Sequence, residues 1–422
     1  MIDAINNAKT VKNLLAKLVQ NIPARLRAAE RQAFISFTMI NKLVPEQKAL
    51  LNRYFNDLLL LMRDYEASDI DFGGRGSNNC IWLRIHGQKK PFGQLGYYQP
   101  DEMNILIQCQ LTESQREQFH SHRSIDFHYD IPDDNGKAHR YRAHAYFELN
   151  NVALNMRAIN TEIRPYDSYG FQPNVTRAFS LKYSKQGLSL VTGITGSGKS
   201  TTLDAIVDLN NRSIDAHIII IAAPVEFIHN SNRSIIRHRE VGLDTVSFKR
   251  GIVESLRQDP DIIIIGEMRD PETILAALEA TDSGHKVFST LHTSSATESI
   301  DRIIAEVPVS DRDRVRHRLA DILKCVVSQK LVPGTHGKLL LAKEVLVKTP
   351  SVKAAIKNNN TSEIYQMIAE GAREGMITME QDLRRLCQAG KISRETAVNY
   401  ANNKRRMEQL LQSEMSLLNF NH

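Results

Sequence analysis

The chain has 422 residues, of which 42% are hydrophobic and 24% are charged, so it has the composition of a globular protein and the length of about three domains. Its formal charge of +6 comes from 54 basic and 48 acidic residues without a long run of one sign, which gives no basis for predicting nucleic-acid binding. The longest apolar runs, such as residues 58–62, are far too short to span a bilayer. The 4 cysteines form no CxxC pair that would indicate a zinc site.

The first part of the chain is expected to hold two pieces. Residues 1–45 are rich in Leu, Ala, Lys and Arg at helical spacing, which predicts a helical N-terminal extension of unassigned role. Residues 46–163 combine a helical pattern at 50–65 with alternating segments at 80–85 and 141–146, which predicts a small α+β domain. The chain opens without the pattern of a leader peptide, so we expect a cytoplasmic protein that does not insert into a membrane.

The second part is expected to form an α/β core followed by helices. Residues 164–180 are polar and contain Gly and Pro, which suits a linker. Within residues 181–348, strand-like apolar runs alternate with helical patterns, and this alternation predicts a parallel sheet. The runs are residues 187–192, 217–221, 261–265 and 286–291. Residues 349–422 have a helical period and predict a C-terminal helical region.

Residues 193–200 read GITGSGKS, which matches GxxxxGK followed by Ser or Thr. A strand pattern precedes this segment and a helical pattern follows it, as a phosphate-binding loop requires. Its glycines let backbone N–H groups point at phosphate oxygens, and the helix N-terminus adds partial positive charge. We therefore predict that Lys199 reaches the β- and γ-phosphates of ATP and that the Ser200 hydroxyl binds Mg²⁺. The predicted nucleotide-binding residues are Gly193, Ile194, Thr195, Gly196, Ser197, Gly198, Lys199, Ser200 and Thr201.

A nucleotide site also needs an acid near the metal, and Glu267 is the best candidate. It closely follows the apolar run 261–265, which resembles a Walker B strand, although an acid at a surface turn is the simpler alternative. We expect this strand to lie beside the strand that leads into the phosphate-binding loop, so that both end at one crevice. Glu226 follows the strand at 217–221 and could orient water in this crevice. Its spacing alone favours this role and a plain surface position equally.

Several sequence blocks occur in a fixed order through this core. They are GITGSGKSTT at 193–202, PVEF at 224–227, REV at 239–241, LRQDPD at 256–261, GEMRD at 266–270, GH at 284–285 and TLHT at 290–293. Together they make residues 188 to about 347 similar to the secretion ATPases of type II secretion and type IV pili. The resemblance is strongest to pilus retraction ATPases of the PilT type.

This resemblance implies a RecA-like P-loop ATPase core preceded by a PAS-like domain. It implies a homo-hexameric ring in which ATP and Mg²⁺ bind between the two domains, whose closure does mechanical work. By the same resemblance Glu226 is the catalytic carboxylate, Glu267 is the Walker B acid, and His285 and His292 sense the nucleotide. Without the surrounding motif, a His that follows a glycine at position 285 would more often be an ordinary turn residue. The ring would act at the inner membrane through a pilus or secretion platform protein.

The N-terminal domain matches the family more loosely, through the segments 67–70 and 139–142. Arg140 and Arg142 are two residues apart, so on a strand they project from one face. With Arg157 they are our candidates for neutralising charge on the γ-phosphate, and arginines on a solvated strand are the alternative.

The chain also departs from the family pattern. Ala222 and Ala223 stand where the family has Glu-Asp, which removes two carboxylates from the metal's neighbourhood. Asn150 replaces an expected arginine and Asp71 an expected histidine. Residues 354–357 read AAIK in place of a helix with Ile-Arg that is associated with retraction, so the direction of the motor stays open. The chain has no four-cysteine zinc module, which argues against the larger assembly enzymes.

The sequence thus predicts a hexameric, Mg²⁺-dependent ATPase that powers type IV pilus retraction, as in twitching motility, or a related secretion step. One alternative is a weakly hydrolysing, nucleotide-gated scaffold, which the two alanines favour. A second is an assembly or secretion ATPase of the same superfamily. A RecA-like nucleic-acid translocase is a third, but 6% aromatic residues and a modest charge give no sign of a channel that binds nucleic acid.

Overall fold

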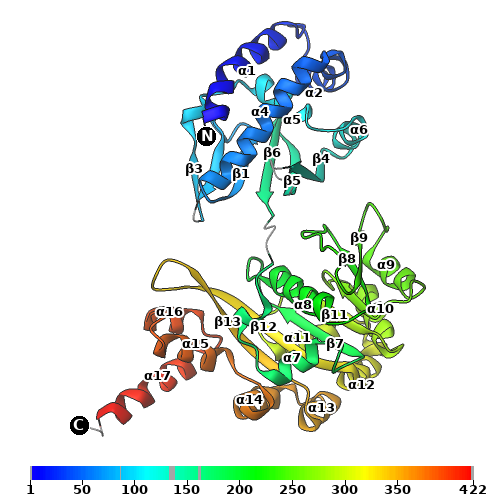
Figure 1. Ribbon diagram of the computed structural model, residues 1–422, viewed down its shortest axis with the longest axis vertical. Helices are drawn as coiled ribbons and strands as arrows, with labels where there is room; N and C mark the ends of the chain where they lie inside the picture. Colours follow the sequence, from blue (N-terminus) through cyan, green and yellow to red (C-terminus); the bar gives the residue numbers. More distant parts are fainter. Residues whose placement is uncertain (1, 86, 133–137, 160–162, 420–422) are drawn as a thin grey trace. The chain divides into compact units, whose positions relative to one another are not determined.

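The computed structural model describes residues 2–85, 87–132, 138–159 and 163–419 (Figure 1). The chain forms two compact units, Met1–Thr161 and Glu162–His422. None of the helices in the described part of the chain combines the length and the apolar character needed to cross a bilayer.

The first unit is built on a six-stranded antiparallel sheet of order β3-β2-β1-β6-β5-β4. Along β1, Ile70 and Phe72 point into the core while Asp69 and Asp71 occupy the other face, the alternation expected of a sheet with one packed face. The elements are α1 (Ile2–Gln20), α2 (Ala28–Ala33), α3 (Ile40–Lys42), α4 (Pro45–Asp64), β1 (Ala67–Gly73), β2 (Trp82–Ile85), β3 (Gln88–Pro91), α5 (Pro100–Gln108), α6 (Glu113–His122), β4 (Ser124–Pro132), β5 (Ala138–Glu148) and β6 (Asn151–Ala158).

Helix α1 belongs to the core of the first unit. Val11 and Leu15 are fully buried in the same hydrophobic cluster as Phe55 of α4. The N-terminal segment that the sequence suggested as an extension therefore packs as part of this unit. Its apolar residues recur at helical spacing because they face α4 and α5.

The second unit contains a seven-stranded sheet of order β13-β12-β7-β11-β10-β8-β9, in which β13 alone runs antiparallel to its neighbour. Its elements are α7 (Pro173–Phe179), β7 (Gly187–Thr192), α8 (Lys199–Ser213), β8 (His217–Ala222), β9 (Ile235–Glu240), α9 (Phe248–Ser255), β10 (Ile262–Ile265), α10 (Pro271–Asp282), β11 (Lys286–Leu291), α11 (Ala296–Glu306), α12 (Arg312–Ile322), β12 (Leu323–Pro333), β13 (Leu339–Val347), α13 (Pro350–Lys357), α14 (Ile364–Glu370), α15 (Met379–Gln388), α16 (Arg394–Tyr400) and α17 (Lys404–Asn419).

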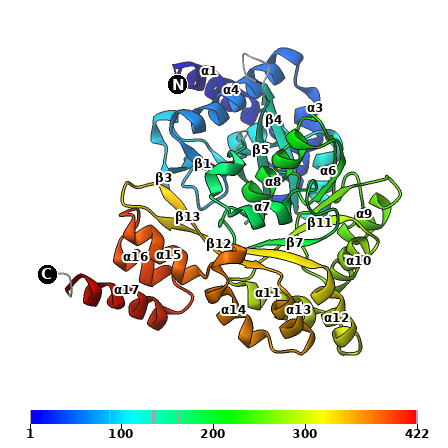
Figure 2. The ribbon, with the colours of Figure 1, turned by 60° about the horizontal axis from the view of Figure 1, so that its bottom comes forward.

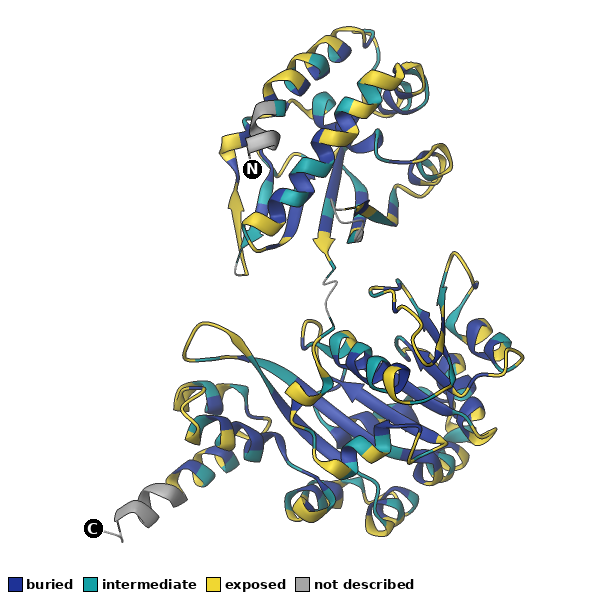
Figure 3. Ribbon diagram, viewed as in Figure 1, coloured by how far each residue is buried: buried dark blue, intermediate teal, exposed yellow. Residues whose placement is uncertain are grey.

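Helices cover both faces of this sheet (Figures 1 and 2). Helices α7 and α8 pack on one face against Ile220, Ile264 and Phe288, and helices α9 to α14 pack on the other against Leu190 and Ile265. The central strands are consequently buried on both sides, as Figure 3 shows. This explains why these strands read as unbroken apolar runs in the sequence.

The order of the strands corrects one expectation. Strands β7 and β10, which lead to the phosphate-binding loop and to Glu267, were expected to be neighbours, but β11 lies between them. Strand β11 pairs in parallel with both and ends at Leu291, so His292 enters the same edge of the sheet between the other two groups.

The segment 164–180, expected as a linker, is packed into the second unit. Tyr169, Val175 and Phe179 are buried, and the rings of Phe179 and Phe288 lie 6.0 Å apart. The Tyr169 hydroxyl donates a hydrogen bond of 3.0 Å to the Thr201 carbonyl in α8. The segment therefore packs on the second unit through a few apolar side chains, although most of its residues are polar.

Helices α15 and α16 pack against the outer strands β13 and β12, and α17 packs on these two helices, with Met379 and Leu383 buried in the same cluster as Val332. The Lys330 ammonium at the end of β12 donates to the Tyr400 carbonyl at 2.8 Å and to Asn402 Oδ1 at 2.7 Å. The Asn402 amide in turn donates to the Ser294 carbonyl at 3.2 Å. The C-terminal helices are thus bonded to the sheet as well as packed on it.

The chain offers a direct test of this division, because its single tryptophan, Trp82, lies in the first unit. Leu15→Ala should destabilise that unit by about 2–5 kcal/mol, since it empties a fully buried site. Phe179→Ala should destabilise the second unit by about 3–5 kcal/mol for the same reason. In urea, Leu15→Ala should lower the midpoint of the Trp82 fluorescence transition, whereas Phe179→Ala should lower the far-ultraviolet circular dichroism midpoint.

Lys17→Ala, at an exposed position of α1, is the matched control and should leave both midpoints near those of the wild type. A Trp82 midpoint that is unchanged by Leu15→Ala would show that α1 does not belong to the folded first unit.

Candidate nucleotide-binding site

The predicted catalytic segments meet at one edge of the second unit's sheet. The loop 193–200 follows β7, Glu226 follows β8, Glu267 follows β10 and His292 follows β11. These strands are parallel, so all of their carboxyl ends lie at the same edge. The topology therefore brings together groups that are far apart in the sequence.

The glycine-rich loop has the backbone geometry that its sequence predicts. Gly196 and Gly198 have φ values of 80° and 86°, which favour glycine, and α8 begins immediately afterwards at Lys199. Gly193 is enclosed, because a Cβ there would lie 2.4 Å from both the Gln329 carbonyl oxygen and Ser197 Oγ. The loop thus ends at a helix N-terminus, where backbone N–H groups are free to bind an anion.

Lys199 lies within this loop rather than extending into solvent. Its ammonium donates to the carbonyl oxygens of Gly193 at 2.9 Å and Ile194 at 3.1 Å. Partial burial lowers the pKa of Lys199, and the charges of Glu267 and Glu226 partly oppose this shift. Both predicted carboxylates are therefore close enough to act electrostatically on the lysine. Ser200 is exposed at the start of α8.

Glu267 is held between two cationic or titratable groups. Arg269 Nη2 forms an ion pair of 2.7 Å with Glu267 Oε2, and His292 Nε2 lies 3.7 Å from the same oxygen. Burial lowers the pKa of His292, with further lowering by Lys199 and Arg269 and partial opposition from Glu267. The imidazole is therefore kept neutral near pH 7 and can act as a hydrogen-bonding group rather than as a charge.

The segment that carries Glu226 is tied to its neighbours at two points. The Val225 N–H donates to Glu240 Oε2 at 3.0 Å. His229, whose side chain is only 1% exposed, lies with Nε2 3.0 Å from Asp204 Oδ1 of α8. This second contact fixes the Glu226 segment to the helix that begins at the phosphate-binding loop.

The two alanines of the altered box lie next to this segment. Ala222 ends β8, and a Cβ on Gly266 would lie only 3.3 Å from the Ala222 Cβ, so its methyl group sits against the residue before Glu267. Ala223 is exposed and precedes Pro224 across a cis peptide bond. The position beside Glu267 thus holds a methyl group where the family has an acid.

The structure does not group His285 with His292. His285 precedes β11, so it lies at the opposite edge of the sheet from the phosphate-binding loop. Its Nδ1 is 2.9 Å from Ser283 Oγ and 3.1 Å from the Ala280 carbonyl, contacts that close the end of α10. Within one chain, His285 and His292 cannot both lie beside the phosphate-binding loop, because they lie at opposite ends of β11.

The predicted arginines all lie on the antiparallel sheet of the first unit. Arg142 and Arg157 face each other directly across β5 and β6 and are exposed. Arg157 Nε binds Asp69 Oδ1 at 2.8 Å, and Asp69 is itself only 3% exposed, which fixes this guanidinium. Arg140 is the least accessible, with Nε 3.5 Å from Asp130 Oδ1. The sheet therefore presents paired arginines on the face away from the core.

Sequence reasoning missed several supporting groups. Arg269 lies inside a quoted block, but nothing in the pattern assigned it to Glu267. Asp204 and His229 are 25 residues apart and Gln329 lies 132 residues after Ser197, so their contacts depend on the fold and leave no local pattern.

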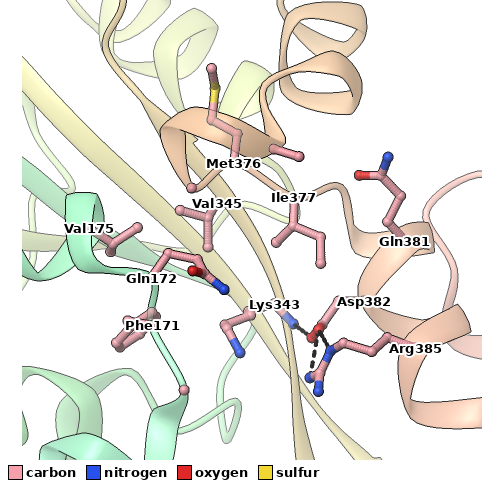
Figure 4. A pocket seen from close by; sticks show the side chains of 13 residues that line it. Phe171, Gln172, Val175, Lys343, Val345, Met376, Ile377, Gln381, Asp382 and Arg385 are labelled. Carbon is pink, nitrogen blue, oxygen red and sulfur yellow. Dashed lines mark hydrogen bonds and ion pairs between the residues drawn. The ribbon is translucent and has the colours of Figure 1, made fainter. Parts of the chain in front are cut away.

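A separate cavity of 320 Å³ lies in the second unit, away from the loop 193–200 (Figure 4). Phe171, Val345 and Met376 are among its apolar lining residues. The polar atoms at its wall serve the chain itself, since Lys343 Nζ donates to the Tyr169 carbonyl at 3.0 Å and Arg385 pairs with Asp382 at 2.8 Å. This cavity therefore has no set of convergent polar groups directed at a ligand.

Comparison with known proteins identifies the family of the chain. A family described as "Type II/IV secretion system protein" matches residues 138–417. The chain is 35% identical over 326 residues to a "Twitching motility protein" of Neisseria gonorrhoeae, which covers 77% of this chain and 85% of that protein. It is 37% identical over 296 residues to the "Type IV pilus retractation ATPase PilT" of Pseudomonas aeruginosa, which covers 70% and 84%.

Among solved structures, that of the pilus retraction motor PilT with bound ADP aligns with a TM-score of 0.75 at 32% identity. The alignment covers 84% of this chain and 98% of that one. The mixed α/β fold that the sequence predicts is thereby confirmed.

The electrostatics around His292 can be tested by titration. Arg269→Gln should raise the pKa of His292, because it removes a nearby positive charge and releases Glu267 from its ion pair. Glu267→Gln should lower the pKa of His292 below its value in the wild type, because it removes the negative charge that raises this pKa. Histidine-selective NMR titration measures both shifts, with His292→Gln identifying the signal.

Lys249→Gln, which removes a lysine paired with Glu272 on the surface, serves as the control and should leave this pKa unchanged. Equal shifts in all three variants would mean that the groups around Glu267 are not arranged as described.

Proposed function

Because this chain belongs to the type II/IV secretion system protein family and is a PilT-type secretion ATPase, we propose that it hydrolyses ATP to power retraction of a type IV pilus or a closely related secretion step. The observation that carries this proposal is the convergence of Lys199, Glu226, Glu267 and His292 at one edge of a parallel sheet beside a glycine-rich loop. These are the groups that phosphoryl transfer to water needs.

In this proposal the loop residues 193–201 and Lys199 bind the phosphates of ATP. Ser200, exposed at the first turn of α8, and Glu267, through water, hold Mg²⁺. The ion would neutralise charge on the phosphate oxygens. The donor set suits this ion, which prefers hydroxyl, carboxylate and water oxygens.

Glu226 orients the attacking water, and the contact of His229 with Asp204 keeps its segment against α8. His292 is the proposed sensor, because its neutral imidazole lies 3.7 Å from Glu267 and its pKa is lowered by burial and by the charge of Lys199. Arg140, Arg142 and Arg157 are the proposed groups that neutralise charge on the γ-phosphate. For His285 we propose no role at the nucleotide of its own chain.

We further propose a homo-hexameric ring that acts in the cytoplasm against an inner-membrane platform protein. In each chain the first unit would correspond to a PAS-like domain and the second to a RecA-like domain followed by C-terminal helices. Differences in binding energy between the ATP and ADP states would drive the two to move relative to each other.

A nucleotide-gated scaffold is the second candidate, and one observation favours it. Ala222 presents a methyl group against Gly266, directly before the proposed metal-binding acid, where the family has a carboxylate. A site with fewer acids around its metal would bind ATP and turn it over slowly.

Steady-state ATP hydrolysis with Mg²⁺ separates the two. In Glu226→Gln we expect kcat to fall by about 100-fold or more with ATP binding retained, because the water loses its orienting group. In Lys199→Ala we expect binding itself to be lost. Glu272→Gln, a glutamate whose side chain is 68% exposed, is the matched control and should hydrolyse like the wild type.

The double variant Ala222→Glu/Ala223→Asp restores the family's acids. If the wild type binds ATP without turnover and this variant hydrolyses it, the scaffold is the correct function and our proposal is wrong.

A further inference from the structure

The side chain of Gln329 bonds on both sides of the junction between the phosphate-binding loop and α8. Gln329 lies on β12, one residue beyond the pairing of Ser328 with Thr192, and is only 1% exposed. Its Nε2 donates to the Ser197 carbonyl at 2.8 Å, and its Oε1 accepts from Thr202 Oγ1 at 3.0 Å, a hydroxyl whose single hydrogen is shared with the Gly198 carbonyl at 3.2 Å. Ser197 lies within the loop and Thr202 lies in the first turn of α8, so one amide group spans the point at which loop becomes helix.

The backbone of the same residue also contacts the start of the loop. A Cβ on Gly193 would lie 2.4 Å from the Gln329 carbonyl oxygen, and a Cβ on Gly198 would lie 3.4 Å from its Nε2. Gln329 therefore touches the loop at its first residue, at Ser197 and Gly198, and just after its last. The amide group also lies close against the glycine that precedes Lys199.

This loop needs an external support because of its composition. Gly193, Gly196 and Gly198 all have positive φ values, and glycine loses more conformational freedom on ordering than any other residue. The N–H groups that would bind phosphate must nevertheless point in one direction before ATP arrives. A buried amide bonded on both sides of Lys199 supplies that fixed shape.

We propose that Gln329 is a positioning residue for ATP binding, which holds the phosphate-binding loop in its binding conformation through its amide group. It acts through Ser197 and Thr202 and need not touch the nucleotide. The proposal rests on the proposed function, since it assumes that the loop binds ATP.

The chemistry of the contact is specific to glutamine. One partner is a carbonyl, which needs a donor, and the other is a hydroxyl that donates, which needs an acceptor. A carboxylate offers only acceptors and would repel the Ser197 carbonyl, whereas a protonated carboxyl group has one donor and one acceptor. Methionine has a similar length and forms neither bond.

Binding of a fluorescent ATP analogue to the full chain, at a temperature where every variant is folded, tests this proposal. Gln329→Met should raise the Kd by roughly 10-fold, because the loop loses a buried hydrogen bond on each side of Lys199. Thr202→Val, which removes the hydroxyl that bonds to Gln329 and to the Gly198 carbonyl but leaves the bond from Gln329 to Ser197, should raise the Kd by less. It serves as a second variant should Gln329→Met not fold. Val327→Ala, a buried change on the same face of β12, should lower the melting temperature without changing the Kd.

The pH profile of Gln329→Glu separates positioning from a general structural role. Burial raises the pKa of the new carboxyl group, so at low pH it is neutral and reproduces the amide's donor and acceptor. The ratio of its Kd to that of the wild type should therefore lie near one at about pH 5.5 and rise several-fold by about pH 8.5, as the group ionises.

A wild-type Kd in both Gln329→Met and Thr202→Val, or a ratio for Gln329→Glu that does not change with pH, would overturn the positioning role. Failure of the wild type to bind the analogue would instead overturn the proposed function together with this inference, so the two failures are distinguishable.

Discussion

The parallel direction of β7, β8, β10 and β11 is the constraint on which the rest of the second unit depends. Parallel strands must be joined by crossovers, so helices cover both faces and the strands become continuous apolar runs. The same direction sends every polar segment that follows a strand to one edge. The chain thus separates an apolar sheet interior from a polar edge without needing its polar residues to be close in sequence.

At that edge the charges of Lys199 and Glu267 have partners within the chain. Lys199 donates to backbone carbonyls within its own loop, and the charges of Glu267 and Glu226 partly oppose the lowering of its pKa by burial. Glu267 forms an ion pair with Arg269. A bound nucleotide would bring several negative charges into this balance. The lysine, the arginine and the neutral histidine would each then have a new partner, so small movements of these side chains are a natural response to the phosphate.

The sequence predicted the local elements well where one pattern carries one structure. The phosphate-binding loop, the strand before it and the helix after it are recognisable because strand, glycine turn and helix N-terminus each leave a local signal. The order of strands was not, because β11 enters between β7 and β10 through packing that no local pattern records. The position of His285 has a related cause: although it is close to His292 in sequence, β11 separates the two and they lie at opposite ends of that strand.

Other misses have the same origin in long-range packing. The segment 164–180 looks polar, yet Val175 and Phe179 are buried against the sheet. Helix α1 reads as an extension in the sequence, although it belongs to the core of the first unit. The tie between His229 and Asp204 joins two elements that only the folded chain brings together. Sequence patterns report the periodicity of a segment, but they do not report which surface it finds.

The hydrogen bonds of Lys330 connect the C-terminal helices to strand β12. The Lys330 ammonium is half-buried, and burial lowers its pKa, while the charges of Glu380 and Glu344 partly oppose this shift; the Tyr400 carbonyl and Asn402 Oδ1 accept its hydrogen bonds. A chain that ended before Tyr400 would leave this ammonium without either group, one residue from Gln329, and would release the Ser294 carbonyl, two residues from His292. The segment 400–402 therefore connects β12 to the segment that follows β11, and we expect its removal to disturb these two segments before the outer surface of the helices.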